Sequence, residues 1–165
     1  MGTPIAVGPA PAGFDRFDLV LALLRRAFAA HAGRIDPPSS STRDTPEILR
    51  ALAAGGRLFL ATTAPVTTAE GTPVGCVFAR ADGDACHLCK LAVDPDFQGQ
   101  GIGRRLLDAL VADARAVGFT RVTLGVRLAL TGNIALFERH GFIRTGERCH
   151  PGFTTPTSQD MALTL

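Results

Sequence analysis

Apolar residues recur every three or four positions in two long stretches of this chain, which is the period of a helix that buries one face. The stripe of the first stretch is Phe17, Val20, Leu21, Leu24 and Phe28, and that of the second is Leu106, Leu107, Leu110, Val111 and Ala114. Two shorter helices are indicated by their ends, because Thr45 and Pro46 are typical helix openers and Gly141 a typical helix stop. We therefore predict helices over 15–32, from 45 to the residue before Gly55, from within the glycine-containing segment before Leu106 to about 117, and over 133–140.

Short segments rich in branched and aromatic residues, bounded by turn residues, predict strands. These segments are 4–7, 57–63, 73–80, 85–93, 120–126, 142–148 and 160–165. The turn 81–84, which contains Gly83, predicts a hairpin between the third and fourth strands. The order is one strand, two helices, three strands, a helix, a strand, a helix and two strands, without an internal repeat. This order predicts one mixed α+β or α/β domain over residues 1–165.

The composition narrows the class of protein. The chain has 165 residues, of which 46% are hydrophobic and 19% charged, as expected for a globular enzyme. Its net charge is only +2 and no basic run occurs, so we expect no nucleic-acid partner. No segment approaches the roughly 20 apolar residues of a membrane span. The start, Met1 to Ala6, lacks the basic region of a secretion signal, so we expect a cytoplasmic protein without a membrane partner.

Four cysteines are present, namely Cys76, Cys86, Cys89 and Cys149. Cys86 and Cys89 form a C-x-x-C pair, but they fall in a predicted strand, where residues three apart point to opposite faces. A structural zinc site would need a turn there and a second ligand pair. We therefore predict no metal site and interpret the cysteines as buried free thiols.

A glycine-rich segment follows the fourth predicted strand and leads directly into a helix. The strand ends in Leu91-Ala92-Val93, and the loop carries Gly99, Gly101 and Gly103. Glycines let an anion approach the backbone closely, and the first N–H groups of a helix form the positive end of its dipole. The pattern predicts an anion-binding loop, with phosphate as its usual ligand. The alternative is a turn that merely caps the helix.

Gln98, Gly101 and Gly103 give the spacing Q-x-x-G-x-G, which, with the strand before it, resembles the acetyl-coenzyme A signature of the GCN5-related N-acetyltransferases (GNAT). The segment from Asn133 to Phe142 resembles a second family motif. The order of elements matches the family over nearly the whole chain, and the specific motifs fall within about 87–142. The resemblance implies a mostly antiparallel sheet of about seven strands flanked by about four helices. It also implies that the fourth and fifth strands splay apart to admit the pantetheine arm.

The resemblance assigns the pantetheine amides to the backbone of the fourth strand and the pyrophosphate to the glycine loop. The residues expected to bind acetyl-CoA are Leu91, Ala92, Val93, Gln98, Gly99, Gln100, Gly101, Ile102, Gly103, Arg104, Asn133 and Phe137. For Leu91 and Val93 the alternative is a role in the core, which is compatible with backbone binding. For Asn133 the alternative is a helix N-cap.

Phe137 departs from the family pattern. Many relatives carry a tyrosine here, whose hydroxyl can protonate the departing thiolate of coenzyme A. Phenylalanine has no such proton, and the chain contains no tyrosine at all. Three alternatives remain: another side chain donates the proton, water donates it, or the thiolate departs without a proton. The last is feasible because a thiol with a pKa of about 8.5 is a tolerable leaving group.

A base is needed because an amine with a pKa of about 10 is protonated, and not nucleophilic, at neutral pH. Counting back from Gln98, the position of the base glutamate of histone-acetylating relatives falls on His87. A histidine can perform this task directly or through water. The alternative for His87 is an ordinary hydrogen-bonded histidine of a strand. The rival base is His150, followed by Glu138 and His140, which fit a surface helix.

Acceptor recognition is expected from two proline-containing loops, 34–41 and 150–158. The candidate residues are Arg34, Ser39, Arg127 and His150. Arg127 follows the fifth strand and has the geometry to pair with a substrate carboxylate, with a structural ion pair as its alternative.

These features predict an N-acetyltransferase that uses acetyl-CoA and no metal. The acetyl group passes to a primary amine of a small molecule or peptide by direct attack in a ternary complex. No cysteine has a context that marks it as an acyl-enzyme nucleophile. The alternatives are a hydroxyl acceptor, another acyl group, or a non-catalytic sensor that binds an acyl-CoA. A homodimer is also open, since dimers are common among the relatives.

Overall fold

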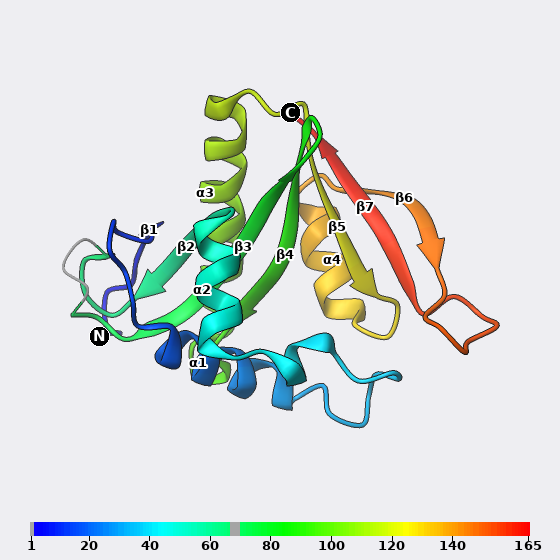
Figure 1. The fold of residues 1–165 in the computed structure, drawn as a ribbon, viewed down its shortest axis with the longest axis horizontal. Coiled ribbons are helices and arrows are strands. Elements are labelled where there is room, and N and C mark those ends of the chain that lie inside the picture. Colours follow the sequence, from blue (N-terminus) through cyan, green and yellow to red (C-terminus); the bar gives the residue numbers. More distant parts are fainter. Residues whose placement is uncertain (1, 67–69) are drawn as a thin grey trace.

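The chain folds as an open sheet with helices on both faces (Figure 1). The computed structural model describes residues 2–66 and 70–165. Within these residues the strands are β1 (Ala6–Pro9), β2 (Arg57–Thr62), β3 (Pro73–Asp82), β4 (Ala85–Val93), β5 (Arg121–Arg127), β6 (Ile143–Arg148) and β7 (Ser158–Thr164). The helices are α1 (Phe17–Ala29), α2 (Pro46–Ala54), α3 (Ile102–Val117) and α4 (Thr131–Arg139), with short 3-10 turns η1 (Ser40–Arg43) and η3 (Pro95–Phe97).

The predicted order of elements is confirmed, and the differences are confined to element ends. The first strand lies two residues later than predicted, because its ladder with β2 runs from Ala6 to Pro9. The first helix ends at Ala29 rather than at 32, and the chain then turns through Gly33, whose φ is +75°. The capping hydroxyl of Thr45 accepts the N–H of Ile48, as the sequence predicted. The last helix starts at Thr131, two residues before the predicted start.

The seven strands formed by the described residues are ordered β1-β2-β3-β4-β5-β7-β6. All neighbouring pairs are antiparallel except β4 and β5, which are parallel. The exception has a physical cause, since α3 connects these two strands and returns the chain to the end from which β4 began. The predicted mixed, mostly antiparallel sheet is therefore confirmed.

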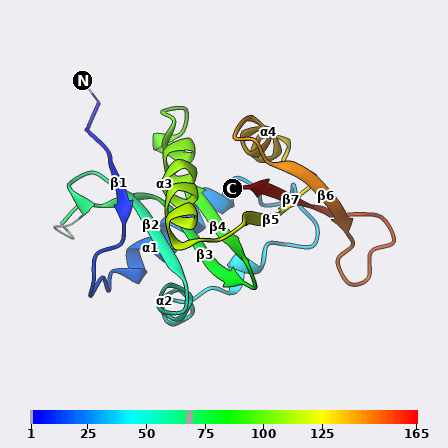
Figure 2. The ribbon, with the colours of Figure 1, turned by 90° about the horizontal axis from the view of Figure 1, so that it is seen from above.

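The helices bury their apolar stripes on opposite faces of the sheet (Figure 2). The α3 stripe predicted from the sequence is fully buried and forms the centre of one core. On the other face α1 and α2 pack on β2, β3 and β4, and Leu24, Leu49 and Phe78 belong to the same buried cluster. Figure 1 shows the connection between α1 and α2 passing across the lower ends of β4 and β5.

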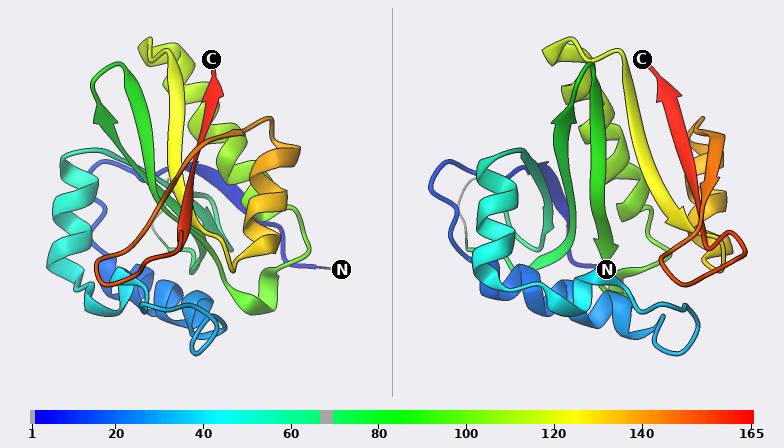
Figure 3. Two further views of the ribbon diagram at one scale, coloured as in Figure 1. Left: turned by 90° about the vertical axis from the view of Figure 1, so that its right-hand side faces the viewer. Right: turned by 45° about the vertical axis from the view of Figure 1, so that its right-hand side comes forward.

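The fourth and fifth strands separate part-way along their length. They pair only from Ala85 to Leu88 on β4 and from Arg121 to Leu124 on β5. Immediately beyond, the ladder between β3 and β4 shifts register, so that Cys89 is an extra residue and forms a bulge. The right view of Figure 3 shows the two strands close together at their upper ends and apart at their lower ends. The predicted splay is thus present, and the bulge coincides with its start.

The cysteine predictions are partly confirmed. Cys86 packs in the core beneath α3, whereas Cys89 packs on the opposite face, as expected for a C-x-x-C pair in a strand. Cys76 is also buried, and burial raises the pKa of its thiol to about 12. The prediction of buried thiols is wrong for Cys149, which is exposed because it follows the sheet-edge strand β6.

Over residues 2–66 and 70–165, no three His, Cys, Asp or Glu side chains gather in a group that could hold a metal ion. The helices of the same ranges are all too short or too polar to span a membrane.

Candidate functional site

The separation of β4 and β5 opens a cleft of about 1000 Å³, walled by α1, α3, α4 and the loops 30–41 and 148–151. It brings together segments that lie more than 100 residues apart in the sequence. The predicted site residues that line it are Arg34, Ser39, His87, Leu91, Ala92, Val93, Gln98, Gly99, Gly101, Ile102, Gly103, Arg104, Arg127, Asn133, Phe137 and His150. Gln100 is the exception, because its side chain lies outside the lining of the cleft.

The glycine loop has a backbone that only glycine adopts readily. Gly99 and Gly101 have φ values of +78° and +74°, in the left-handed region. A Cβ added at either position would meet nothing within 4 Å, so both face open space rather than protein. Gly101 is the N-cap of α3, and the first N–H groups of that helix have no acceptor within it. The loop therefore presents free donors and a positive helix end to the cleft, which together suit an anion.

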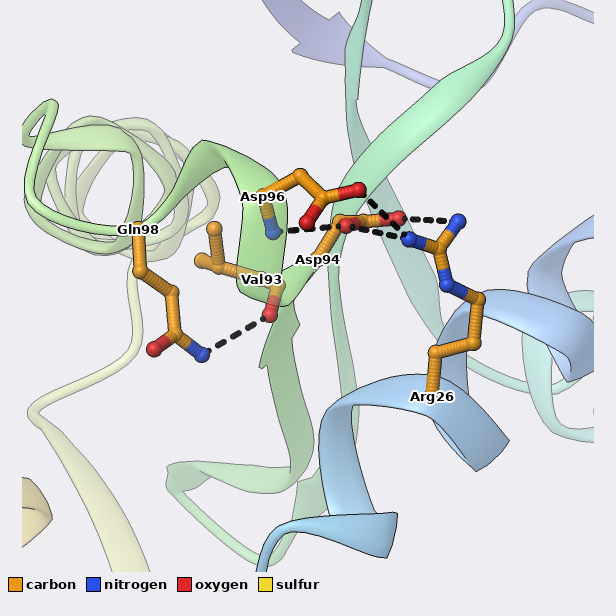
Figure 4. A network of polar contacts seen from close by, with 5 residues as sticks. All are labelled: Arg26, Val93, Asp94, Asp96 and Gln98. Atoms are coloured by element: carbon orange, nitrogen blue, oxygen red, sulfur yellow. Dashed lines mark hydrogen bonds and ion pairs between the residues drawn. The ribbon is translucent and has the colours of Figure 1, made fainter.

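The start of the loop is held by side chains (Figure 4). The Asp94 carboxylate is buried, accepts the N–H of Asp96 at 2.9 Å and pairs with Arg26 of α1, with 2.9 Å between Oδ2 and Nη1. On the other side, Nε2 of Gln98 donates to the carbonyl of Val93 at 3.2 Å. The first turn of the loop is thus fixed to α1 and to the end of β4.

The backbone of β4 offers hydrogen-bonding groups to the cleft. The N–H of Asp94 donates to Val74 of β3 at 2.8 Å, and successive residues of a strand point their amide groups in alternate directions. The amide groups of Val93 and Leu91 therefore point away from β3, into the gap. Their side chains pack against the core beneath α3. Both interpretations of these two residues, core and backbone binding, are consistent with the structure.

On α4, Asn133 and Phe137 line the same cleft. Asn133 lies in the first turn of the helix, while Leu130 occupies the N-cap, so the N-cap alternative for Asn133 is wrong. Phe137 is 5% exposed and packs edge-to-face on Phe142, with 5.7 Å between ring centroids. At the position where many relatives carry a tyrosine, this chain therefore has an apolar side chain in the cleft wall.

His87 lies beside the closed end of the gap. Cys86 and Leu88 pack beneath α3, so His87 between them points to the opposite face. There its Nδ1 forms a 2.9 Å hydrogen bond with the hydroxyl of Thr123, its partner in the parallel ladder. Burial lowers the pKa of the imidazole, and the neighbouring Arg80 adds to this effect. The ring is therefore neutral at pH 7 and able to accept a proton.

His150 approaches the cleft from the loop between β6 and β7. Its Nδ1 bonds the hydroxyl of Thr157, which also accepts the backbone N–H of His150 at 3.1 Å. Burial lowers the pKa of this imidazole too, and Arg127 and Arg148 contribute. His150 thus remains a rival to His87.

The other two candidate bases do not reach the cleft. Nε2 of His140 is 3.4 Å from Asp108, and its ring stacks on Phe142. Glu138 is exposed and is not part of the lining. Glu138 thus fits the surface-helix alternative, whereas this alternative is wrong for His140, whose side chain is only 12% exposed.

Arg127 holds a loop, which corrects the interpretation of this residue as part of a structural ion pair, while its role in binding a substrate carboxylate stays a prediction. Its Nη2 donates to the carbonyls of Pro37 and Pro38, at 2.6 and 3.3 Å. Burial lowers the pKa of the guanidinium. The predicted structural ion pair is replaced by these carbonyl contacts, which fix the loop after α1 against β5. Of the loop residues, Arg34 is exposed on the cleft wall, and the hydroxyl of Ser39 caps η1 by accepting the N–H of Ser41.

Two residues at the site gave no signal in the sequence, namely Thr123, which bonds His87, and Arg148, which lines the cleft. Thr123 became visible only through the register of β4 and β5. Arg148 lies over Gly125, where an added Cβ would stand 3.0 Å from its Nη2, and that nitrogen also donates to Asp160 at 2.6 Å. Arg148 reaches the cleft because β7 runs between β5 and β6, a strand order that spacing along the sequence does not reveal.

Comparisons with known proteins agree on one family. Residues 19–142 match the sequence profile of the Acetyltransferase (GNAT) family. [Ribosomal protein bS18]-alanine N-acetyltransferase from Escherichia coli (strain K12) is 42% identical over 59 residues, which are 36% of this chain and 40% of that protein. Mycothiol acetyltransferase from Geodermatophilus obscurus is 44% identical over 54 residues, which are 33% of this chain and 18% of that protein. The chain thus matches less than half the length of these relatives.

Solved structures share the fold over almost the whole chain. The ribosomal-protein-S18-alanine N-acetyltransferase from Escherichia coli superposes with a TM-score of 0.74 at 23% identity, covering 98% of this chain and 94% of that one. A GNAT family acetyltransferase from Elizabethkingia anophelis with acetyl-CoA bound gives a TM-score of 0.66 at 22% identity, covering 98% of each chain.

Proposed function

Since the chain belongs to the GNAT family and is an acyltransferase, we propose that it transfers an acetyl group from acetyl-CoA to a primary amine by direct attack. The observation that carries this proposal is the cleft between β4 and β5, with the left-handed glycine loop and the start of α3 at its edge. That arrangement combines an anion site with a slot lined by free backbone amides, which suits a phosphorylated, amide-containing cofactor.

The residues present fit acetyl-CoA. The backbone N–H groups at the start of α3 face the cleft, and the open space at Gly99 and Gly101 leaves room for a pyrophosphate. The guanidinium groups of Arg104 and Arg139 also line the cleft and add positive charge. The amide groups of Leu91 and Val93 pair with the pantetheine amides. Bound in this way, acetyl-CoA supplies the activated acetyl carbon.

His87 is the general base of the proposed reaction. It lies at the closed end of the gap, is neutral at pH 7, and is oriented by its hydrogen bond to Thr123. A neutral imidazole there accepts the amine proton, directly or through water. The second candidate is His150, favoured by its place in the lining and its own lowered pKa.

No side-chain acid is required for the leaving group. Phe137 has no proton to donate, and the sequence holds no tyrosine that could replace it. A thiol with a pKa of about 8.5 departs as a thiolate without prior protonation at neutral pH. Phe137 instead provides an apolar part of the cleft wall and is itself packed on Phe142.

Two measurements test the proposal together. Calorimetric titration with acetyl-CoA tests the donor site, with saturable binding expected. Thiol release from acetyl-CoA, measured across a panel of amines and alcohols, tests the transfer, with amine-dependent release expected. Saturable binding without release by any acceptor would favour the acyl-CoA sensor instead, and release with alcohols alone would favour a hydroxyl acceptor. Lack of binding would reject the donor assignment.

A further inference from the structure

The charge of the cleft is one-sided. Among the described residues that line it, six are arginine or lysine, three are histidine, and none is aspartate or glutamate. The six cations are Arg34, Lys90, Arg104, Arg127, Arg139 and Arg148. The chain as a whole is nearly balanced, with 17 basic and 15 acidic residues. The composition therefore does not explain why carboxylates are absent from the described lining of the cleft. Their absence should affect which ligands the cleft binds.

The donor accounts for only part of this charge. Arg104 and Arg139 lie on α3 and α4, on the side of the glycine loop, where the phosphates of acetyl-CoA are proposed to bind. Lys90 is neutralised by Asp44, with 2.8 Å between Nζ and Oδ2. Arg127 is engaged by the carbonyls of the loop after α1. Arg127 keeps its charge, because these carbonyls are neutral, but it is committed to holding the loop. Arg34 and Arg148 are the other cations of the acceptor side, and Arg148 also pairs with Asp160, with 2.6 Å between Nη2 and Oδ1.

Arg148 has the position expected of a group that contacts the acceptor. It lies over Gly125, the residue directly after the last paired position of β5, Leu124. Gly125 is on the same face as Thr123, two residues earlier, and therefore on the face to which His87 points. Nη2 of Arg148 donates to the Asp160 carboxylate. A guanidinium has five N–H donors, so the others can bind a substrate group. A substrate group at the closed end of the gap would thus meet an arginine beside the proposed base.

Because a cationic acceptor would enter a cleft whose described lining residues include no aspartate or glutamate, we propose that the acceptor is a small amine that carries a carboxylate, bound by Arg148 with Arg34 adding to the positive field. The inference rests on the proposed function and names the substrate class of the same site. Like charges disfavour polyamines there, whereas arginine binds carboxylates through parallel N–H donors. A cleft of about 1000 Å³, shared with the pantetheine arm, suits a small acceptor.

The transfer balances with this acceptor. The neutral amine nitrogen forms a bond to the acetyl carbon, and the C–S bond breaks with its electron pair going to the sulfur. The proton lost by the nitrogen passes to His87. The carboxylate stays bound to Arg148 throughout and takes no part in the bond changes, so it affects recognition of the acceptor rather than the chemistry.

Matched acceptors provide the test. Each amino acid of a panel is compared with its amide, and a diamine of similar length is included, all at saturating acetyl-CoA. Rates are expressed per concentration of neutral amine, since the amide and the acid differ in amine pKa. We expect kcat/KM about tenfold or more higher for the acid, the range of a charge-assisted hydrogen bond. Preference for the amide or the diamine would overturn the inference.

Arg148→Gln should bring the ratio of acid to amide close to one while leaving KM for acetyl-CoA unchanged. Arg144→Gln is the matched control, because Arg144 lies on the same strand, pairs with Glu147 and does not line the cleft. It should keep the wild-type ratio. A ratio that persists in Arg148→Gln, or that falls equally in both variants, would contradict the role of Arg148.

An equilibrium measurement separates this inference from the proposed function. The N-acetyl amino acid and its amide are titrated calorimetrically into protein saturated with CoA. Tighter binding of the acid, lost in Arg148→Gln, supports the inference even if turnover is slow. Equal binding of the two ligands rejects it while the donor assignment stands. If CoA itself fails to bind, the proposed function fails, and the same titration on the free protein still decides whether the cleft prefers a carboxylate.

Discussion

Lys90, the single lysine of the chain, forms an ion pair with Asp44 in which Nζ and Oδ2 are 2.8 Å apart and both side chains are nearly buried. Nζ also donates to the hydroxyl of Ser41 at 3.3 Å. The pair joins β4, one residue past the bulge at Cys89, to the loop that precedes α2. Together with Arg127 it sets the position of the loop that walls the acceptor side of the cleft.

Replacing Lys90 with methionine should lower the free energy of unfolding by about 3 kcal/mol, because the Asp44 carboxylate then stays buried without its cation. Replacing both residues with apolar ones of similar size should recover part of this loss. Urea unfolding of the two variants measures both effects. Arg50→Gln is the control, since Arg50 pairs with Asp15 at the surface and its loss should change stability by less than about 1 kcal/mol. Equal losses in the two single variants would show that the Lys90 pair is no more than a surface contact.

Glutamate at Gly101 should abolish binding of acetyl-CoA, because it places a carboxylate in the anion site and a side chain in the open space of the loop. The left-handed φ of +74° adds a backbone cost of about 1 kcal/mol. The fold should survive this cost. Calorimetry measures the affinity, and circular dichroism and thermal unfolding check the fold.

The matched control is Gly118→Glu at the other end of the same helix. Gly118 also has a left-handed φ, +99°, and also faces open space. Its substitution carries the same backbone cost but lies outside the cleft, so affinity for acetyl-CoA should remain that of the wild type. Unchanged affinity in Gly101→Glu would remove the loop from the proposed donor site.

The pH dependence of the rate should identify the base. Burial and Arg80 lower the pKa of His87, so its imidazole is neutral at pH 7 and becomes protonated only below its ordinary value of about 6.5. The value of kcat/KM, corrected for amine ionisation, should therefore be constant near neutrality and fall as the pH drops below that value. His87→Gln should lower kcat by about 100-fold, abolish this acidic limb and leave KM for acetyl-CoA unchanged.

His150→Gln is the matched variant, because the pKa of His150 is also lowered and this residue also lines the cleft. It should retain the acidic limb. The opposite outcome, in which the limb disappears with His150 and persists without His87, would transfer the role of base to His150.

Asp94→Ala should weaken acetyl-CoA binding and lower the free energy of unfolding by about 1–2 kcal/mol, because the N–H of Asp96 and the Arg26 guanidinium lose their acceptor. The first turn of the glycine loop would then no longer be held to α1. Asp96→Ala is the control, since the Asp96 side chain is 78% exposed and makes only the outer contact with Arg26. Calorimetry and urea unfolding compare the two, and a larger effect of Asp96→Ala would contradict this account of the loop.

Much of the fold could be predicted because its signals are local. The apolar stripe of α3, the cap at Thr45 and the hairpin at Gly83 depend on residues within a few positions of one another, and the structure has each of them. The ends of strands, such as those of β1, were predicted less accurately, because a strand extends as far as its partner strand offers hydrogen bonds. That partner is distant in the sequence.

In the candidate site, too, the residues of continuous motifs were predicted and the contacts between distant segments were not. The residues around Gly101 and Asn133 were found because each motif is a continuous segment, and both segments line the cleft. The structural ion pair expected for Arg127 was wrong because its acceptors, Pro37 and Pro38, lie about 90 residues away. Arg148 was missed because only the strand order β5-β7-β6 places it over Gly125.

The sequence alone thus determined the family resemblance, the glycine loop and the candidate base, since each depends on spacing along the chain. Tertiary structure alone decided the charge of the cleft, because that charge depends on which side chains from separate strands and loops face one space and which are already paired. Asp44 pairs with Lys90, the carbonyl of Pro37 accepts from Arg127, and Asp160 accepts from one nitrogen of Arg148. Electrostatic interactions fall with distance in space rather than along the chain, so the proposal of a carboxylate-bearing acceptor could be argued only from the fold.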